Sequence, residues 1–230
     1  MKPDISIIIP AYNEENYIAT TLESIHKSAF LGTYEVIVVC NGCTDSTARI
    51  AEGMGARVFT MSAKGAPEAM NYGAQQAKAD ILAFLDADTT MSSHLLRDVL
   101  DARMRGYVGG RTVVRWSGES LVAKMSRIVS YVHKHKWGGF CFLDRELFNK
   151  IGGYATGAKY GFDFDLSHRA QREGKSAFLR KSYVVTSNRR FEKEGWLKHL
   201  WLASKRYYID ERLLRAGVKH GKHIEYEDYR

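Results

Sequence analysis

Short apolar runs alternate with amphipathic segments along the first 88 residues. Runs rich in β-branched residues predict four buried strands, at residues 5–9, 34–39, 57–59 and 81–85. Between them, apolar residues at helical spacing predict helices over residues 17–28, 46–54 and 66–77. Each crossover is long enough for a right-handed parallel connection. This half therefore predicts an open, mostly parallel α/β sheet with helices on both faces.

The pattern after Ser92 is less regular. It predicts helices over residues 93–104, 119–133, 145–151 and 195–216. Strands are predicted near residues 112–114 and between Gly139 and Asp144, and a further helix is predicted to begin at Leu166. The helix over residues 195–216 combines aromatic and basic residues, which suits core packing, an anionic membrane surface or a dimer interface.

Composition and charge exclude several classes of protein. Hydrophobic residues make up 45% of the 230-residue chain, which argues against disorder. No apolar run approaches the roughly 18 residues of a membrane span, and three cysteines form no disulfide framework. These features favour a soluble cytoplasmic protein. The net charge is −5 over residues 1–100 and +13 over the remainder, so nucleic acid, anionic lipid and phosphorylated ligands are the partners to consider.

Polar residues follow the predicted strands where ligands usually bind in such sheets. Residues 10–15 follow the first strand, residues 40–45 follow the second, and Asp86-Ala87-Asp88 follows the fourth. Two carboxylates at the exit of a buried strand favour a divalent cation, Mg or Mn, that also takes oxygens from a substrate phosphate. The other interpretation of these aspartates is a turn or a helix cap.

Several nucleotide and metal motifs are absent. The sequence has no G-x-G-x-x-G after the first strand and no P-loop. Cys40 and Cys43 form a C-x-x-C, but an Asn-Gly turn separates them and no second pair exists, which disfavours redox or metal chemistry. Lys64 offers a cation for a nucleotide, or is a solvated surface charge.

A series of motifs resembles family 2 glycosyltransferases. The motifs occur in that family's order and with similar spacing between residues 4 and 175. They are Ile7–Glu15, Asn41–Thr47, Lys64-Gly65, Asn71-Tyr72-Gly73, Phe84–Asp88, Leu143-Asp144-Arg145, Ile151–Tyr154 and Phe162–Leu166. The resemblance implies a single GT-A-type domain over residues 1–230. Its expected parts are a nucleotide-sugar-binding half (1–92), an acceptor-side half (93–190) and a helical, basic C-terminal extension (191–230).

The resemblance also implies roles for individual residues. Asp86 and Asp88 match the D-x-D motif that binds the donor diphosphate and its metal, Mn or Mg. Asp163 matches the general base that deprotonates the acceptor hydroxyl; its other interpretation, shared with Asp165, is a cap of the following helix. The expected donor-binding residues are Pro10, Ala11, Tyr12, Asn13, Glu14, Asn41, Lys64, Asp86, Arg189 and Arg190. A third metal ligand could come from His133, His135, His168 or His199.

Two positions depart from the family pattern. Phe162 stands where a glutamate precedes the base, and Cys40 and Asn41 stand where paired aspartates are common. A neutral Asn41 presents different donors and acceptors to a nucleobase, so the nucleotide is left open. The Q-x-x-R-W motif of processive synthases is absent, which disfavours polymer extension.

The sequence therefore predicts an inverting, metal-dependent glycosyltransferase. Its donor would be a nucleoside-diphosphate sugar, and its acceptor a hydroxyl of a glycan or lipid-linked glycan at the inner membrane face. One alternative is a nucleotidyltransferase that makes nucleotide sugars, although residues 12–15 lack its Gly-rich, basic phosphate loop. The other is a basic nucleic-acid-binding protein, which would give Asp86, Asp88 and Asp163 no role.

Overall fold

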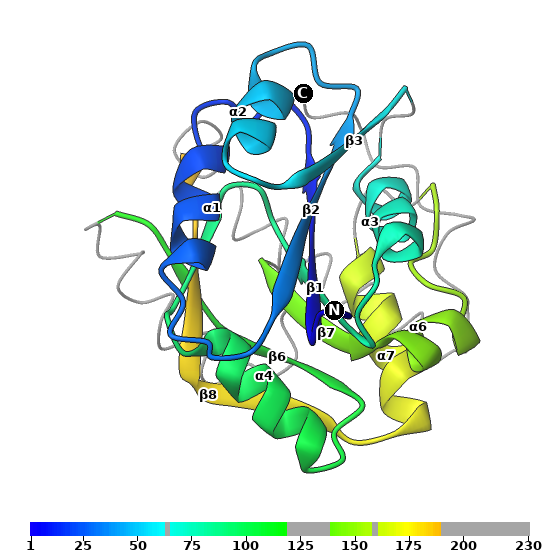
Figure 1. Ribbon diagram of the computed structural model, residues 1–230. Coiled ribbons are helices and arrows are strands. Elements are labelled where there is room, and N and C mark those ends of the chain that lie inside the picture. The colour runs from blue at the N-terminus through cyan, green and yellow to red at the C-terminus, as the bar shows by residue number, and fades with distance from the viewer. Residues whose placement is uncertain (63–64, 119–138, 158–160, 190–230) are drawn as a thin grey trace.

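The computed structural model describes residues 1–62, 65–118, 139–157 and 161–189. Over these residues the chain forms one mixed sheet in the order β3-β2-β1-β4-β7-β6-β8-β5 (Figure 1). The strands are β1 (Ile5–Ala11), β2 (Tyr34–Asn41), β3 (Arg57–Met61), β4 (Ile81–Leu85), β5 (Thr89–Met91), β6 (Gly109–Trp116), β7 (Phe140–Asp144) and β8 (Ser176–Thr186). The helices are α1 (Ile18–His26), α2 (Thr47–Gly53), α3 (Ala66–Gln76), α4 (Leu95–Met104), α6 (Arg145–Lys150) and α7 (Phe162–Glu173).

The first half of the sheet is parallel. β1 pairs with β2 on one side and with β4 on the other, and β2 pairs with β3. β1, β2 and β4 are buried along most of their length, which explains their nearly continuous apolar sequences. Their carboxyl ends lie side by side at one edge, because Ile8 of β1 is in register with both Ile37 and Phe84.

The second half of the sheet mixes strand directions. β7 is antiparallel to both β4 and β6, whereas β6 and β8 are parallel. The three-residue strand β5 follows Asp88 directly and pairs with the end of β8, with Thr89 opposite Thr186. This pairing brings the chain after β8 back to the end of β4.

Helices cover both faces of the sheet, as predicted. Residues of α1, α2 and α4 form one apolar core with one face of the strands. Residues of α3, α6 and α7 form a second core with the opposite face (Figure 1). The second core contains a group of aromatic rings around Tyr154, which is 1% exposed. The predicted α/β architecture is therefore confirmed.

The elements differ from prediction mainly in the second half. The strands β5 and β8 were not predicted. The helix expected from Leu166 begins earlier, at Phe162, so Asp163 lies within its first turn and not before it. The predicted helices over residues 119–133 and 195–216 lie outside the described residues.

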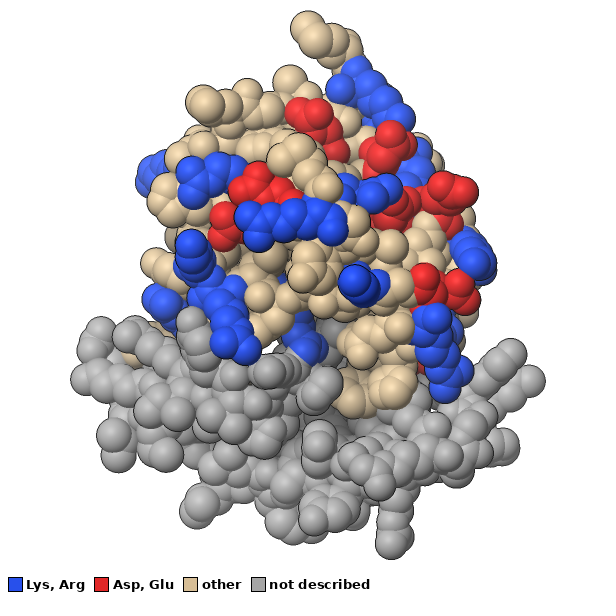
Figure 2. Space-filling view, turned by 90° about the horizontal axis from the view of Figure 1, so that it is seen from below, with Lys and Arg blue, Asp and Glu red and all other residues tan. Residues whose placement is uncertain are grey.

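The described residues contain no helix long and apolar enough to cross a membrane. On the face seen in Figure 2, acidic and basic side chains are interspersed over the described part of the chain.

Candidate functional site

The loop after β1 is tied to the loop after β2. Asn13 adopts a positive φ of 55°, and its side-chain oxygen accepts a hydrogen bond from the Thr44 amide at 2.8 Å. The Glu14 amide donates to the Thr47 hydroxyl at 2.8 Å, and the amide of Glu15 donates to Asp45 at 3.1 Å. These bonds hold the two loops as one unit at the edge of the parallel half.

The predicted donor-binding residues of this unit have different environments. Ala11 is buried in the core, and its carbonyl accepts a hydrogen bond from the Cys43 thiol at 3.3 Å. Tyr12 is 47% exposed at the rim. Asn41 is 5% exposed, and its Oδ1 has no hydrogen-bond partner among the described residues. Pro10 lies at the end of β1, between Ile9 and Ala11.

The two cysteines of the C-x-x-C motif lie beside these residues, with Cys40 buried and Cys43 partly buried. Burial and the neighbouring Cys43 raise the pKa of the Cys40 thiol to about 12. A thiol that stays protonated is a poor nucleophile and metal ligand.

Asp86 and Asp88 emerge from the end of β4, where the sequence placed them. The Oδ2 atom of Asp86 accepts a hydrogen bond from the Gly139 amide at 3.0 Å, and the Asp86 amide donates to the Gly139 carbonyl at 3.2 Å. The carbonyl of Ala87 accepts from the buried Thr21 hydroxyl of α1 at 2.8 Å. The backbone of this short segment is therefore held by the residue that precedes β7 on one side and by α1 on the other.

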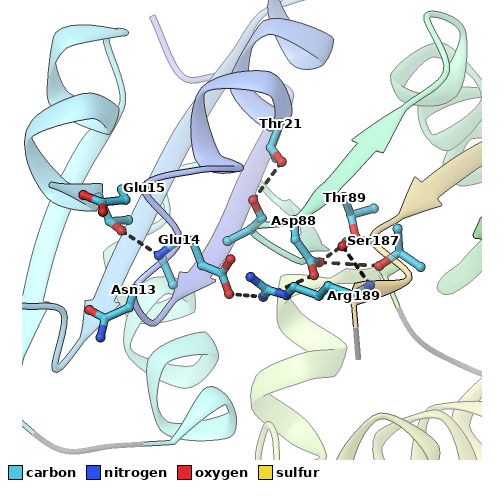
Figure 3. A network of polar contacts seen from close by, with 12 residues as sticks. Asn13, Glu14, Glu15, Thr21, Asp88, Thr89, Ser187 and Arg189 are labelled. Atoms are coloured by element: carbon cyan, nitrogen blue, oxygen red, sulfur yellow. Dashed lines mark hydrogen bonds and ion pairs between the residues drawn. The ribbon is translucent and has the colours of Figure 1, made fainter. Parts of the chain in front are cut away.

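Asp88 belongs to a charged network that includes Arg189 and Glu14 (Figure 3). The Arg189 guanidinium lies 3.3 Å from Oδ2 of Asp88 and also pairs with Glu14. It stacks over the Tyr17 ring, 4.6 Å from the ring centroid. Burial raises the pKa of Glu14, and the hydrogen bond from Arg189 opposes this rise. An arginine thus balances two carboxylates at the edge of the sheet.

Asp163 shares a pocket with Asp86. The pocket is lined by Met70, Phe84, Asp86, Gly139, Phe140, Cys141, Tyr154 and Asp163. Desolvation and, second, the negative charge of Asp86 raise the pKa of Asp163 to about 7, whereas a hydrogen bond from Tyr154 lowers it. A carboxylate with a pKa near neutrality can accept a proton at neutral pH.

Asp165 has a different role from the predicted helix cap. No side chain caps the N-terminus of α7, where the N-cap residue is Gly161. Asp165 is buried and pairs with Arg169, whose Nε lies 2.9 Å from Oδ2. The same guanidinium donates to the carbonyls of Ile151 and Gly153. The capping interpretation of Asp165 was therefore wrong: the residue orients an arginine that ties α7 to the end of α6.

Other predicted residues are outside the site or outside the described chain. Lys64, Arg190, His133, His135 and His199 lie outside the described residues. His168 is exposed, and its ring lies 5.7 Å from the Phe164 ring. Phe162, which replaces the expected glutamate, packs edge-on against Tyr154.

The carboxylates of Asp86 and Asp88 suit a metal ion whose other ligands come from a bound substrate. The described residues contain no group of three or more His, Cys, Asp or Glu side chains that could hold a metal ion alone. Mg and Mn commonly use one or two protein carboxylates and complete their shell with substrate phosphates and water. Asp88, with Asp86 beside it, fits that pattern, and the Arg189 pairing shows that Asp88 accepts a positive partner.

The curled mixed sheet with helices on both of its faces has the GT-A fold. Solved structures with this fold align with most of the chain. The model of the family described as "Glycosyl transferase family 2" matches residues 6–169. The chain belongs to this family.

Curated relatives agree with this assignment. An uncharacterized glycosyltransferase of Rickettsia typhi is 27% identical over 71% of this chain and 57% of its own length. Glycosyltransferase AglD of Haloferax volcanii is 24% identical over 74% of this chain and 31% of its own. The 4,4'-diaponeurosporenoate glycosyltransferase of Staphylococcus aureus is 25% identical over 85% of this chain and 60% of its own length. The chain thus spans about a third to three fifths of these relatives.

Two solved structures illustrate the shared fold. S. aureus TarS aligns with a TM-score of 0.63 at 21% identity, covering 78% of this chain and 36% of TarS. The mannosyltransferase PcManGT of Pyrobaculum calidifontis was solved with GDP-Man and Mn²⁺. It aligns with a TM-score of 0.63 at 20% identity, covering 80% of this chain and 57% of PcManGT.

Proposed function

We propose that this chain transfers a sugar, with inversion, from a nucleoside-diphosphate sugar to a hydroxyl acceptor. The observation that carries this proposal is the pocket in which Asp163, from the start of α7, faces Asp86, from the end of β4. The two carboxylates come from distant parts of the sequence. Transfer needs a group that holds the departing diphosphate and a base near the incoming hydroxyl, and this pocket supplies candidates for both.

The donor would lie across the carboxyl ends of β1, β2 and β4. Buried acceptor atoms without a hydrogen-bond partner among the described residues, Oδ1 of Asn41 and Oε2 of Glu14, support this position. Such atoms are costly unless a ligand donates to them, and nucleobases and riboses carry N–H and O–H donors. Solved neighbours contain UDP-GlcNAc or GDP-Man, which agrees with a nucleotide sugar here.

Asp88 and Asp86 would hold the cation together with the donor diphosphate. A bound Mn or Mg neutralises charge that develops on the leaving diphosphate. Arg189 would exchange its contact with Asp88 for one with a phosphate oxygen, which a guanidinium binds in a bidentate manner. Glu14 would retain Arg189 near the site during this exchange.

Asp163 would accept the proton of the acceptor hydroxyl as that oxygen attacks the sugar. A positioned base typically contributes about 10²–10⁴-fold to the rate. The acceptor would approach over the α7 side of the pocket. The +13 charge of residues 101–230 supports an acceptor at an anionic cytoplasmic membrane surface, such as a lipid-linked glycan.

A panel of nucleotide sugars tests the donor and metal together. UDP-glucose, UDP-GlcNAc and GDP-mannose are each added with Mn²⁺, Mg²⁺ or EDTA, and the thermal midpoint is measured. Ligands that bind only the folded state raise the midpoint, so one donor should stabilise the protein, and only with metal. Asp88→Ala should abolish the metal-dependent part. Stabilisation by no donor, or equal stabilisation in EDTA, contradicts the proposal.

A further inference from the structure

Tyr154 stands at the centre of the second core and reaches the pocket with its hydroxyl. Its ring packs against Phe84, Phe148 and Phe162, with centroid separations between 5.1 and 5.9 Å. The residue is 1% exposed and lines the pocket that contains Asp86 and Asp163. Phenylalanine would satisfy this apolar environment without the cost of a buried hydroxyl, so the hydroxyl calls for a polar explanation.

The backbone of Tyr154 is fixed by a pair of hydrogen bonds to α3. The Tyr154 amide donates to Oδ1 of Asn71, and Nδ2 of Asn71 donates to the Tyr154 carbonyl, both at 2.9 Å. The preceding Gly153 has a positive φ of 65°, and a Cβ there would lie 2.7 Å from Oδ1 of Asn71. Gly153 thus permits the close approach that holds the Tyr154 ring in place.

The hydroxyl of Tyr154 has two polar neighbours in the pocket. Its oxygen lies 3.3 Å from the Cys141 sulfur, and it forms a hydrogen bond with Asp163. An ionised carboxylate only accepts hydrogen bonds, so Tyr154 must donate to Asp163. The Tyr154 oxygen is then free to accept from the Cys141 thiol. Burial raises the pKa of both Cys141 and Tyr154, so both remain protonated donors at neutral pH.

We infer that Tyr154 is a positioning residue that orients the Asp163 carboxylate toward the acceptor, with Cys141 as the next member of the hydrogen-bonded chain. This inference rests on the proposed role of Asp163 as the base. The Tyr154 hydroxyl occupies one acceptor position of the carboxylate and restricts its rotation. The remaining oxygen lone pairs then face the pocket, where a reacting hydroxyl must meet a preoriented base.

The test measures nucleoside diphosphate release with water as the acceptor, using the sugar donor and metal selected by the thermal panel. Tyr154→Phe keeps the ring and removes the hydroxyl. Loss of a hydrogen bond to a charged group should lower kcat by about 10- to 100-fold. The donor KM should stay within about twofold, because the Tyr154 hydroxyl acts on Cys141 and Asp163, which are not among the proposed donor-binding residues. Tyr107 packs against the opposite core, so Tyr107→Phe is the matched control. This variant should retain the wild-type kcat.

A second pair of variants tests the chain of hydrogen bonds. Cys141→Ser keeps a donor beside the Tyr154 oxygen and should retain most of kcat, whereas Cys141→Ala should lower kcat about threefold or more. Should Tyr154→Phe not fold, this pair carries the test. Equal kcat in the Ala and Ser variants then overturns the inference.

The variant Asp163→Asn separates the inference from the proposed function. If Asp163→Asn is inactive and Tyr154→Phe has the wild-type kcat, only the positioning role is overturned. If Asp163→Asn releases nucleoside diphosphate at the wild-type rate, the proposed base is overturned and the positioning role with it. A fall in kcat for both variants, at constant donor KM, is the expected result.

Discussion

At the scale of single residues, the buried position that would suit Asp163 to its proposed role as a base also lowers the stability of the folded protein. Burial and the nearby Asp86 charge favour its neutral form in the folded protein and raise its pKa to about 7, whereas an aspartate in an unfolded chain has a pKa near 3.9. Between these values the folded state binds more protons than the unfolded state. The free energy of unfolding therefore falls as pH rises through this interval.

Asp163→Asn should remove this loss of stability. Each pKa unit corresponds to about 1.4 kcal/mol, and partial solvent access reduces the total. We expect the variant to be more stable than the wild type by about 2 kcal/mol at pH 8 and nearly equal at pH 4. Urea unfolding at a series of pH values measures the difference. Asp101→Asn, on α4 and outside the pocket, should follow the wild type at every pH. A constant offset between Asp163→Asn and the wild type would contradict the assigned environment.

The acidic residues of the site were predictable from sequence, but their partners were not. Asp86 and Asp88 follow a continuous apolar strand, and a strand's exit can be located from that pattern alone. Tyr154 and Asn71 meet only through tertiary packing, so no local spacing indicates their contact. Arg189 reaches Asp88 because β5 pairs with β8. From sequence, only the family resemblance pointed to Arg189.

At the scale of elements, α7 is placed by the Asp165–Arg169 pair. Arg169 joins three acceptors: Asp165 on its own helix and the carbonyls of Ile151 and Gly153 after α6. The carbonyl-bound segment leads directly into Tyr154, and α7 itself carries Asp163. A single guanidinium thus links the segments that bring two pocket residues together.

Arg169→Met should therefore disturb both stability and catalysis. It leaves the buried Asp165 carboxylate without its partner, and such a loss typically costs about 3–5 kcal/mol. We expect a clear fall in the urea midpoint and a lower kcat for nucleoside diphosphate release. Arg172→Met, on the exposed face of α7, should change neither by much. An Arg169→Met protein with wild-type stability would show that α7 is positioned by its apolar contacts alone.

The elements of the second half were harder to predict for identifiable reasons. β5 has only three residues, too few for an alternating pattern to be recognised. β8 has the charged pair Arg180-Lys181 in its middle, and its pairing with β6 shifts register at Thr112 and Val113. A strand with such an interruption does not keep the period of two on which prediction depends.

At the scale of the whole molecule, one sheet carries both the loops proposed to bind the donor and the proposed base. Its parallel half presents the loops proposed to bind the donor, whereas the mixed half and α7 present Asp163. β4 and β7 are neighbours in the sheet, and the pocket opens where they meet.

Hydrogen exchange tests this division. UDP or GDP with Mn²⁺ should slow exchange in peptides that contain residues 10–15, 40–47 and 86–91, because these segments hold the proposed nucleotide and metal sites. Peptides from α4 should exchange as in the free protein. Mass spectrometry of the two states measures the effect. Equal protection throughout the chain, or protection confined to α4, would place the nucleotide elsewhere.

The arginine beside Asp88 has a consequence for the order of binding. Because Arg189 already supplies a positive charge to this carboxylate, a free metal ion gains little by replacing it alone. A metal that arrives with a diphosphate gives the displaced guanidinium a new anionic partner. The Arg189 guanidinium should therefore make the protein a weak binder of bare cations and a strong binder of metal–nucleotide complexes.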